Sequence, residues 1–456
     1  MIELMKRENM QITWIIFHVM MGIVVTYFPL FLILWIYILF ISSGFDLLSK
    51  GNTDGVVHNL LAYYLGMEIL TRITKASPII PYESGKYLMF VLLAIGIAFS
   101  GRTKTANKVG WIIIILIIPS AFVLPATFTY KDIIFNDSGI INLSLCLVYF
   151  SRTPLSPTQL KTTLRFIIYG IIPVLVSVIA QTPDFDDLKF TLAANFDTSA
   201  GFGSNQVSTI LSLGFLIVGF CYLTNVKIFR YSWITFILLG SFFFRGLLTF
   251  SRGGIVGALI VLLLVLIARG YWPVQKVTRV SNLVKILSGV LLVIGVFYYA
   301  NNLTSNILLQ RYQGETKTTL SGLRERDLSL ITSNRIDILY SDLRIWYDHI
   351  LFGVGPGMAK YNRVDLNTNE VAAHVETSRL LAEHGLFGLV ICLILFFYPI
   401  HRISRQNVNF LKLLSICLFG YALFTSFHSA MRTNVTPFLY GLAAVPIYFS
   451  IRAKKK

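Results

Sequence analysis

The chain alternates long apolar runs with short polar segments, and one polar segment is much longer than the others. Most apolar runs have about 20 residues, the length that an α-helix needs to cross the hydrocarbon core of a bilayer. The long polar segment extends from Asn301 to about Glu383, with apolar runs on both sides. The pattern predicts an all-α, polytopic integral membrane protein with one large loop outside the lipid, at residues 304–383.

The first apolar run, from Ile12 to Ser43, is too long for one span and short for two. Pro29 lies within it, and proline interrupts a helix because it lacks a backbone N–H and its ring clashes with the preceding turn. We expect a hairpin of two short helices here, with a single span as the alternative. The remaining runs are each expected to form one span, which gives about 14 spans (12–14). They lie at about 55–73, 84–100, 110–129, 134–150, 164–182, 205–224, 232–250, 254–268, 283–303, 384–400, 411–430 and 434–450.

Lysine and arginine cluster in alternate polar segments, as the positive-inside rule predicts for cytoplasmic loops. The segments between them have fewer cations or balance them with acids. Both termini are therefore expected in the cytoplasm, and the large loop is expected to be extracytoplasmic. A single span in the first run would place the N-terminus outside. The marking cations are Lys6, Arg7, Arg102, Lys104, Lys108, Arg152, Lys161, Lys227, Arg230, Arg269, Lys276, Arg279, Lys285, Arg402, Arg405, Lys412, Arg452 and Lys454 to Lys456.

The composition agrees with a membrane class. The chain is 55% hydrophobic and 13% charged, and a soluble fold could not hide that much apolar surface. The net charge of +17 lies in the loop segments and gives no reason to expect nucleic-acid binding. No repeat or linker divides the chain, so residues 1–456 are expected to form a single membrane domain. The four cysteines lie in apolar runs and are expected to be buried residues, not disulfides or metal ligands: Cys146, Cys221, Cys392 and Cys417.

A candidate anion site lies where one span ends and the next begins. Arg252 stands in Ser251-Arg252-Gly253-Gly254, and the glycines allow a tight turn and close approach of a ligand to the backbone. The next helix begins there, so its positive end points to the same place. An arginine beside a helix N-terminus suits a phosphate. Arg245, seven residues earlier, would share the helix face if the helix is regular. The alternative interpretation of Arg252 is an interfacial arginine whose side chain reaches lipid headgroups.

Further candidates lie in the long polar segment. Asn334 can cap a helix from about Arg335 to His349, with Trp346 on it. Arg335 is a second candidate anion ligand, although a solvated surface arginine is the alternative and Arg311, Arg324, Arg326 and Arg344 look the same by residue type. His374 can remove a proton from a sugar hydroxyl, and Glu376 can orient it. The alternative for His374 is a surface residue at the membrane boundary, and His384 is expected to start a helix.

Evidence for metal or nucleotide chemistry is weak. Asp184, Asp186 and Asp187 form an acidic cluster that could bind Mg²⁺ or Mn²⁺, but a solvated acidic loop is the preferred interpretation. The sequence has no Walker loop, no Cys/His zinc pattern and no Gly-x-Ser-x-Gly elbow. We therefore expect neither a metal nor another cofactor, and no use of ATP.

Taken in order, these motifs resemble the O-antigen ligase and O-antigen polymerase superfamily over roughly residues 200–400. The resemblance rests on Ser251-Arg252-Gly253-Gly254, on Asn334-Arg335 with Trp346, and on His374. The longer motifs that support it are Leu351-Phe352-Gly353-Val354-Gly355-Pro356-Gly357 and Glu383-His384-Gly385-Leu386-Phe387-Gly388. Ser204-Asn205 also looks like the family's entry to the preceding helix, and Pro81-Tyr82-Glu83-Ser84-Gly85-Lys86 is similar to a segment of some members.

The resemblance implies a metal-independent, inverting glycosyltransferase in the bacterial inner membrane. Its donor would be a glycan on undecaprenyl pyrophosphate at the outer face. By the family's pattern Arg252 and Arg335, with Arg245 as a weaker candidate, hold the pyrophosphate, and His374 assists the attacking hydroxyl. The family commonly has Asn directly after this His, whereas Val375 follows here. The base could therefore be a His374–Glu376 pair or Glu376 alone.

Three functions are open at this point. An O-antigen ligase passes the glycan to lipid A core, and the His-containing loop end resembles the ligase-type domain more closely. A polymerase passes the glycan to a second lipid-linked repeat unit and uses the same donor. A polysaccharide flippase also has 12 to 14 spans, but it needs inward-facing charges on several helices, and here the charge is concentrated in one outer loop.

Overall fold

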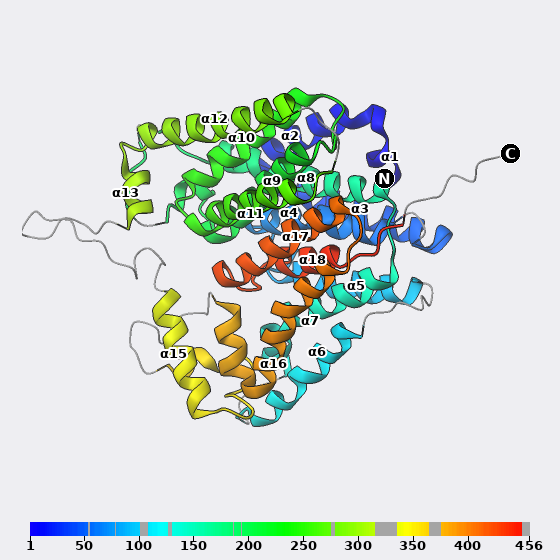
Figure 1. Cartoon of the computed structure of the whole chain (residues 1–456), viewed down its shortest axis with the longest axis vertical. Helices are drawn as coiled ribbons and strands as arrows, with labels where there is room; N and C mark the ends of the chain where they lie inside the picture. The colour runs from blue at the N-terminus through cyan, green and yellow to red at the C-terminus, as the bar shows by residue number, and fades with distance from the viewer. Residues whose placement is uncertain are drawn as a thin grey trace, which may run out of the picture.

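The computed structural model describes residues 1–52, 55–77, 79–100, 108–125, 130–185, 187–192, 194–274, 279–314, 335–363 and 375–448. These residues are almost entirely helical (Figure 1), and their one pairing of extended backbone is an isolated bridge between Leu155 and Ile447. The prediction of an all-α protein is therefore confirmed. His374, Asn334 and Asp186, which the sequence singled out, lie outside the described residues.

Each predicted span falls on a helix of the structure. The elements are α1 (Ile2–Lys6), η1 (Glu8–Met10), α2 (Gln11–Tyr27), α3 (Pro29–Lys50), α4 (Val56–Ile73), α5 (Ser84–Phe99), α6 (Val109–Ile117), η2 (Ile118–Val123), α7 (Tyr130–Arg152), α8 (Pro157–Ala180), η3 (Asp197–Ser199), α9 (Ser204–Thr224), α10 (Ser232–Leu248), α11 (Arg252–Tyr271), α12 (Arg279–Leu303), α13 (Ile307–Gln313), α15 (Arg335–Asp348), η4 (Ala359–Tyr361), α16 (Glu376–Ser404), α17 (Asn409–His428) and α18 (Val435–Ala443). The first run forms two helices, with Pro29 at the first position of α3.

Within the described part of the chain, nine helices are long and apolar enough to cross a membrane, and three shorter apolar helices accompany them. The protein is thus a multi-pass membrane protein, while the count of about 14 spans stays a prediction. The helix α4 shows why length alone does not decide the count. It has 18 residues, all buried, but it carries Glu68 and Arg72. Their side chains form an ion pair of 2.8 Å inside the bundle.

The centre of the bundle is held by a close crossing of α4 and α8. A Cβ atom on Gly66 would lie 1.9 Å from the carbonyl oxygen of Gly170, and one on Gly170 would lie 2.1 Å from that of Tyr63. Small residues let helix backbones approach this closely, so that van der Waals contact stabilises the pair where lipid gives no hydrophobic advantage. A larger residue at either glycine would force the two helices apart.

The long polar segment is folded where the structure describes it. It contributes α13, α15, η4 and the first two turns of α16, which begins at Glu376 and not near His384 as expected. Gly385 interrupts α16 with φ +59°. The glycine-rich turn after α15 docks against this kink, because Val354 N–H donates to the Ala382 carbonyl and Gly355 N–H to that of Glu383, both at 3.0 Å. The glycine-rich turn at 353–357 and the kink at Gly385 therefore pack against each other.

The helices of the polar segment gather at one side of the bundle. In Figure 1, α13 and α15 lie at the left, and α1 lies at the right. The starts of α11 and α16 and the end of α17 lie on the same side as α13 and α15. Arg252, Arg335 and Glu376, which begin α11, α15 and α16, therefore lie on the side away from α1.

Candidate functional site

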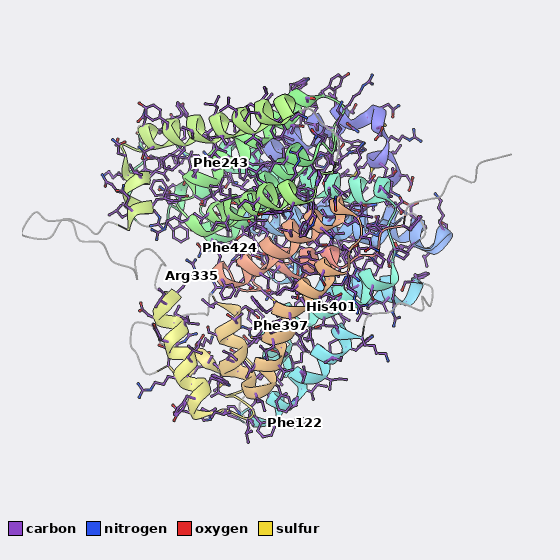
Figure 2. All side chains as sticks on the ribbon, viewed as in Figure 1. Phe122, Phe243, Arg335, Phe397, His401 and Phe424 are labelled. Carbon is purple, nitrogen blue, oxygen red and sulfur yellow. The ribbon has the colours of Figure 1, made fainter. Side chains whose placement is uncertain are left out.

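A cavity of about 290 Å³ and a larger one of about 500 Å³ lie next to each other on this side of the bundle. The larger cavity, which we call the arginine pocket, contains both Arg335 and Phe424 in its wall (Figure 2). Its wall comes from the starts of α9, α11 and α15, from α13, and from the end of α17. The lining residues are Asn205, Ser251, Arg252, Gly253, Val256, Arg311, Tyr312, Arg335, Ile336, Leu339, Val375, Phe424, Phe427 and His428.

The chain reverses sharply before Arg252. The helix α10 ends at Leu248, Phe250 takes the left-handed φ of +54°, and α11 begins at Arg252, as expected. Ser251 is fixed from two sides, since its hydroxyl donates to Asn205 Oδ1 at 2.7 Å and its carbonyl accepts from Ser208 Oγ at 2.8 Å. No side chain caps the first N–H groups of α11, so the positive end of this helix is available to an anion.

The two glycines after Arg252 have a reason that the sequence did not reveal. Neither Gly253 nor Gly254 has a positive φ. A Cβ atom on Gly253 would lie 1.9 Å from Nδ1 of His428, and one on Gly254 would lie 2.6 Å from Oγ of Ser208. The glycines therefore make room for α17 and α9 to pack against the start of α11. This packing places the His428 imidazole in the wall of the arginine pocket.

Three arginines meet in this pocket although they lie far apart in sequence. Arg311 donates from Nε to the Phe250 carbonyl and from Nη1 to that of Leu192, and Arg252 Nη1 donates to the Arg311 carbonyl. Arg335 Nε donates to the His428 carbonyl at 3.2 Å. Among the described residues that line the pocket there is no aspartate or glutamate. The pocket therefore concentrates positive charge.

Burial also lowers the pKa values of two of these arginines. Burial, and next the neighbouring Arg252, lower the pKa of Arg335 to about 10, and burial and Arg252 likewise lower the pKa of Arg311 to about 10. Both guanidinium groups remain protonated at neutral pH. Their proximity is unfavourable in the absence of a counter-charge, because like charges repel more strongly in a desolvated site. An anion in the pocket would relieve this repulsion.

Arg245 lies elsewhere. The regular helix that would align it with Arg252 is interrupted at Phe250, and Arg245 is not among the residues that line the arginine pocket. It is buried, and Nη2 donates to the carbonyls of Val178 at 3.1 Å and Thr198 at 3.3 Å, and to the Thr182 hydroxyl. Its guanidinium group connects α10 to the end of α8 and to η3.

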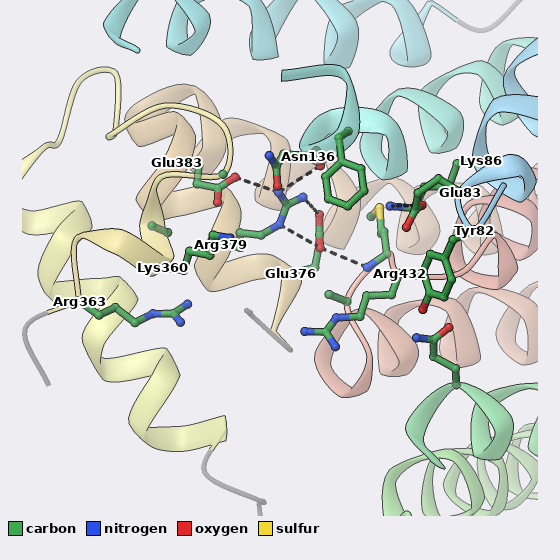
Figure 3. A pocket seen from close by; sticks show the side chains of 16 residues that line it. Tyr82, Glu83, Lys86, Asn136, Lys360, Arg363, Glu376, Arg379, Glu383 and Arg432 are labelled. Atoms are coloured by element: carbon green, nitrogen blue, oxygen red, sulfur yellow. Dashed lines mark hydrogen bonds and ion pairs between the residues drawn. The ribbon is translucent and has the colours of Figure 1, made fainter. Parts of the chain in front are cut away.

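The smaller cavity, which we call the mixed-charge pocket, lies at the start of α16, and Figure 3 shows the side chains that line it. Neighbouring residues divide between the two pockets: Asn205 and Val375 line the arginine pocket, while Gln206 and Glu376 line the mixed-charge pocket. The full lining is Tyr82, Glu83, Lys86, Phe135, Asn136, Gln206, Gly357, Ala359, Lys360, Arg363, Glu376, Arg379, Glu383, Ala430, Met431 and Arg432.

Glu376 is held tightly in this wall. Arg379 Nη2 lies 2.5 Å from Glu376 Oε1, and its Nε lies 3.3 Å from Oε2, which also accepts from Met431 N–H at 3.2 Å. The same guanidinium group reaches Glu383 Oε2 with Nη1 at 2.8 Å. Both oxygens of Glu376 are thus occupied by donors. This carboxylate is suited to holding a position more than to accepting a proton.

Residues 236–393 match the family model described as O-antigen ligase. We call this matched region the O-antigen ligase domain. No curated protein matches the chain. The domain contributes α11, α13, α15 and the first part of α16, and with them all three arginines of the arginine pocket. The predicted core at 200–400 encloses it.

Several lining residues come from outside the O-antigen ligase domain. His428 and Arg432 follow it, and Tyr82, Glu83 and Lys86 precede it. No sequence motif pointed to His428 or Arg432, and Arg311 was one of several arginines that look the same by residue type. The one available signal was the similarity of the Pro81–Lys86 segment to some family members. Three residues of this segment line the mixed-charge pocket in the structure.

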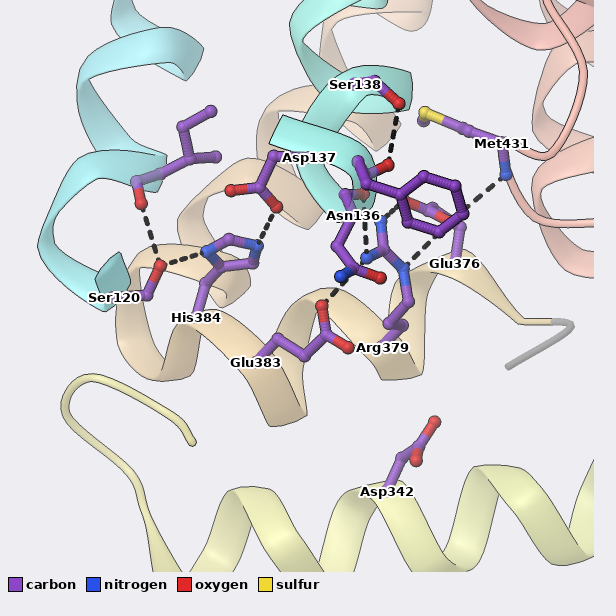
Figure 4. Close-up of polar contacts among 12 residues, drawn as sticks. Ser120, Asn136, Asp137, Ser138, Asp342, Glu376, Arg379, Glu383, His384 and Met431 are labelled. Atoms are coloured by element: carbon purple, nitrogen blue, oxygen red, sulfur yellow. Dashed lines mark hydrogen bonds and ion pairs between the residues drawn. The ribbon is translucent and has the colours of Figure 1, made fainter. Parts of the chain in front are cut away.

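One group of buried residues in the described part of the chain could hold a metal ion. Ligand atoms of Asp137, Glu383 and His384 lie within 4.8 Å of one another. In Figure 4 the His384 ring lies between Ser120 Oγ, 2.6 Å from Nδ1, and Asp137 Oδ1, 3.5 Å from Nε2. Glu383 is paired with Arg379, so the protein already supplies a cation to this group. The predicted acidic cluster differs, because Asp184 and Asp187 are exposed.

Proposed function

We propose that this chain is a glycosyltransferase that moves a glycan from undecaprenyl pyrophosphate to an acceptor hydroxyl at the outer face of the bacterial inner membrane. The observation that carries the proposal is the arginine pocket. Three arginines and a helix N-terminus converge in it, and its described lining contains no carboxylate. A pyrophosphate diester is the ligand that this charge fits, because guanidinium forks and free N–H groups bind phosphate oxygens.

The rest of the pocket suits a lipid-linked donor. Its wall also contains apolar side chains, which are Val256, Ile336, Leu339, Phe424 and Phe427. A charged group next to an apolar surface matches a pyrophosphate that continues into an isoprenoid chain. When the glycosyl bond breaks, negative charge grows on the leaving pyrophosphate, and fixed arginines stabilise that charge without reorganisation.

The assignment of the base uses the order of residues along the chain. Val375 lines the arginine pocket and Glu376 lines the mixed-charge pocket, so the two pockets adjoin at the start of α16. His374 is the preceding residue. Because the Glu376 oxygens already accept hydrogen bonds from Arg379 and Met431, we assign proton removal to His374 and an orienting role to the Glu376–Arg379 pair.

The acceptor is proposed to be lipid A core, which makes the chain an O-antigen ligase. A polymerase would use the same donor and a second lipid-linked repeat unit as acceptor. A deletion strain distinguishes them. Long-chain glycan that accumulates on undecaprenyl pyrophosphate identifies a ligase, whereas single repeat units on lipid A core identify a polymerase.

Transfer by the purified protein tests the reaction class. Full-length protein in detergent, given the lipid-linked glycan isolated from the deletion strain and the acceptor lipid fraction of the same strain, should form the glycosylated acceptor. Inorganic pyrophosphate should compete with the donor, and Arg252→Ala should weaken that competition. Protein in vesicles that moves the lipid-linked glycan between leaflets without forming a new glycosidic bond would identify a flippase and reject the proposal.

A further inference from the structure

The mixed-charge pocket is built differently from the arginine pocket. Three of the five cations in its described lining pair with carboxylates: Arg379 with Glu376 and Glu383, Lys86 with Glu83, and Arg363 with Asp342. A second anionic ligand would have to compete with these carboxylates. A neutral ligand with many hydroxyl groups meets no such competition, because each hydroxyl can donate to a carboxylate and accept from a cation.

One buried carboxylate oxygen in this wall lacks a hydrogen-bond donor among the described residues. This atom is Glu83 Oε2. The nearest cation, Lys86 Nζ, lies 3.6 Å away, which is beyond hydrogen-bonding distance. A buried polar atom without a partner costs free energy that a ligand hydroxyl would recover. Glu83 Oε2 can therefore accept a hydrogen bond from a ligand.

An aromatic ring stands beside this carboxylate. Tyr82 is 49% exposed. The buried Arg72 holds it from behind, with its guanidinium carbon 4.5 Å from the ring centroid and its Nε donating to the Tyr82 carbonyl at 3.3 Å. Arg72 is fixed in turn by Glu68 at 2.8 Å and by Gln206 Oε1 at 2.6 Å. A rigid aromatic surface next to hydrogen-bonding groups is the usual composition of a site for a small organic ligand.

We infer that the mixed-charge pocket binds the terminal sugar of the acceptor, with Tyr82 packing against its ring and Glu83 accepting from one of its hydroxyls. The volume of about 290 Å³ is at the lower end for ligand pockets and suits one sugar unit better than a whole repeat. The inference rests on the proposed function. It deepens that function, because it assigns the acceptor to the pocket that adjoins the arginine pocket at the start of α16.

Steady-state transfer by purified full-length variants tests this inference. The donor is the lipid-linked glycan and the acceptor is the lipid fraction, both from the deletion strain. Glu83→Gln should raise KM for the acceptor about ten-fold, the scale of losing one hydrogen bond to a charged group. Tyr82→Ala should raise it by a similar factor, because the ring surface that packs against the sugar is lost. KM for the donor and inhibition by inorganic pyrophosphate should stay unchanged. Tyr87→Ala is the matched control, because Tyr87 lies nearby, is 46% exposed and lines neither pocket.

The outcomes are separable. Folded variants with unchanged acceptor KM, or with a donor KM raised equally, would overturn the inference and leave the proposed function standing. Tyr82→Phe keeps the ring and should keep most of the acceptor affinity; a loss equal to that of Tyr82→Ala would also overturn the assignment of the ring. Wild-type protein that neither transfers glycan nor binds pyrophosphate would reject the proposed function, and this inference with it.

Discussion

The arginine pocket and the mixed-charge pocket are neighbours with the same kinds of residues, but their charges are arranged differently. Both contain buried cations, and the starts of α9 and α16 and the segment from α17 to α18 contribute to both walls. In the arginine pocket, arginines meet with no carboxylate among the described lining residues. In the mixed-charge pocket, the single side chain of Arg379 forms ion pairs with two carboxylates, those of Glu376 and Glu383. The number of arginines does not identify an anion site; what distinguishes the arginine pocket is that its described lining residues include no carboxylate.

Among the substitutions considered, a change at His374 should lower the transfer rate most. Because His374 precedes the two residues that divide the pockets, His374→Ala should lower the transfer rate on the order of 10²–10⁴-fold, the usual range for a general base. Donor binding should remain nearly intact, since the arginines are unchanged. Transfer kinetics together with direct binding of the lipid-linked donor measure both quantities.

Glu376→Gln is the companion variant for this prediction. Its loss should be smaller, because the carboxylate orients and does not take the proton. An active His374→Ala enzyme beside an inactive, folded Glu376→Gln enzyme would move the base to the carboxylate.

The next effect should come from the arginine pocket itself. Arg252→Lys and Arg335→Lys should each lower the rate on the order of 10²-fold, because lysine lacks the bidentate fork and a fixed donor to the leaving group is lost. Unlike His374→Ala, both should also weaken donor binding, since the pyrophosphate is charged before reaction. Arg344→Lys is the control on the same helix as Arg335, with an exposed side chain outside both pockets.

The pH dependence of the Arg335→Lys variant sharpens this prediction. Burial lowers the pKa of Arg335 to about 10, so the wild-type group stays charged at pH 7–9. A lysine begins from an ordinary pKa of about 10.4, and the same burial would bring it toward the assay range. Its charge is lost as the pH rises. The donor-binding defect should therefore grow from pH 7 to pH 9; a defect that is constant, or variants that bind and react like wild type, would contradict the pyrophosphate assignment.

The sequence predicted the helices well because apolar runs of span length need only local information. It also predicted where α11 and α15 begin, from the Ser251–Gly254 motif and from Asn334 as a capping residue, although the turn before α11 lies at Phe250 and not at the glycines. It could not separate Arg311 from Arg344. The difference between them is that Arg311 is buried against the carbonyls of Phe250 and Leu192 and Arg344 is exposed, which depends on the tertiary packing.

Packing between distant segments also explains the other differences. The left-handed turn at Phe250 separates Arg245 from Arg252, and no residue type there announces it, because glycine is the usual sign of such a turn. The need for Gly253 comes from His428, which arrives from α17. The mixed-charge pocket draws on several segments far apart in the chain, so that no single motif could reveal it.

The smallest effect should follow the removal of divalent metal ions. At a pyrophosphate, a metal ion would neutralise the developing charge, and the arginine pocket is proposed to supply that neutralisation with guanidinium groups. EDTA should therefore leave the transfer rate nearly unchanged, as should Asp186→Asn.

The group of Asp137, Glu383 and His384 is the sharper comparison, because it adjoins the mixed-charge pocket and its ligand atoms could hold an ion. Since Glu383 already pairs with Arg379, we expect Asp137→Asn to lower the thermal stability of the protein more than the rate per folded molecule. Activity that EDTA abolishes and Mn²⁺ restores would contradict this expectation. Loss of the Mn²⁺ response in Asp137→Asn would then place the ion beside His384, and loss in Asp186→Asn would place it in the acidic cluster.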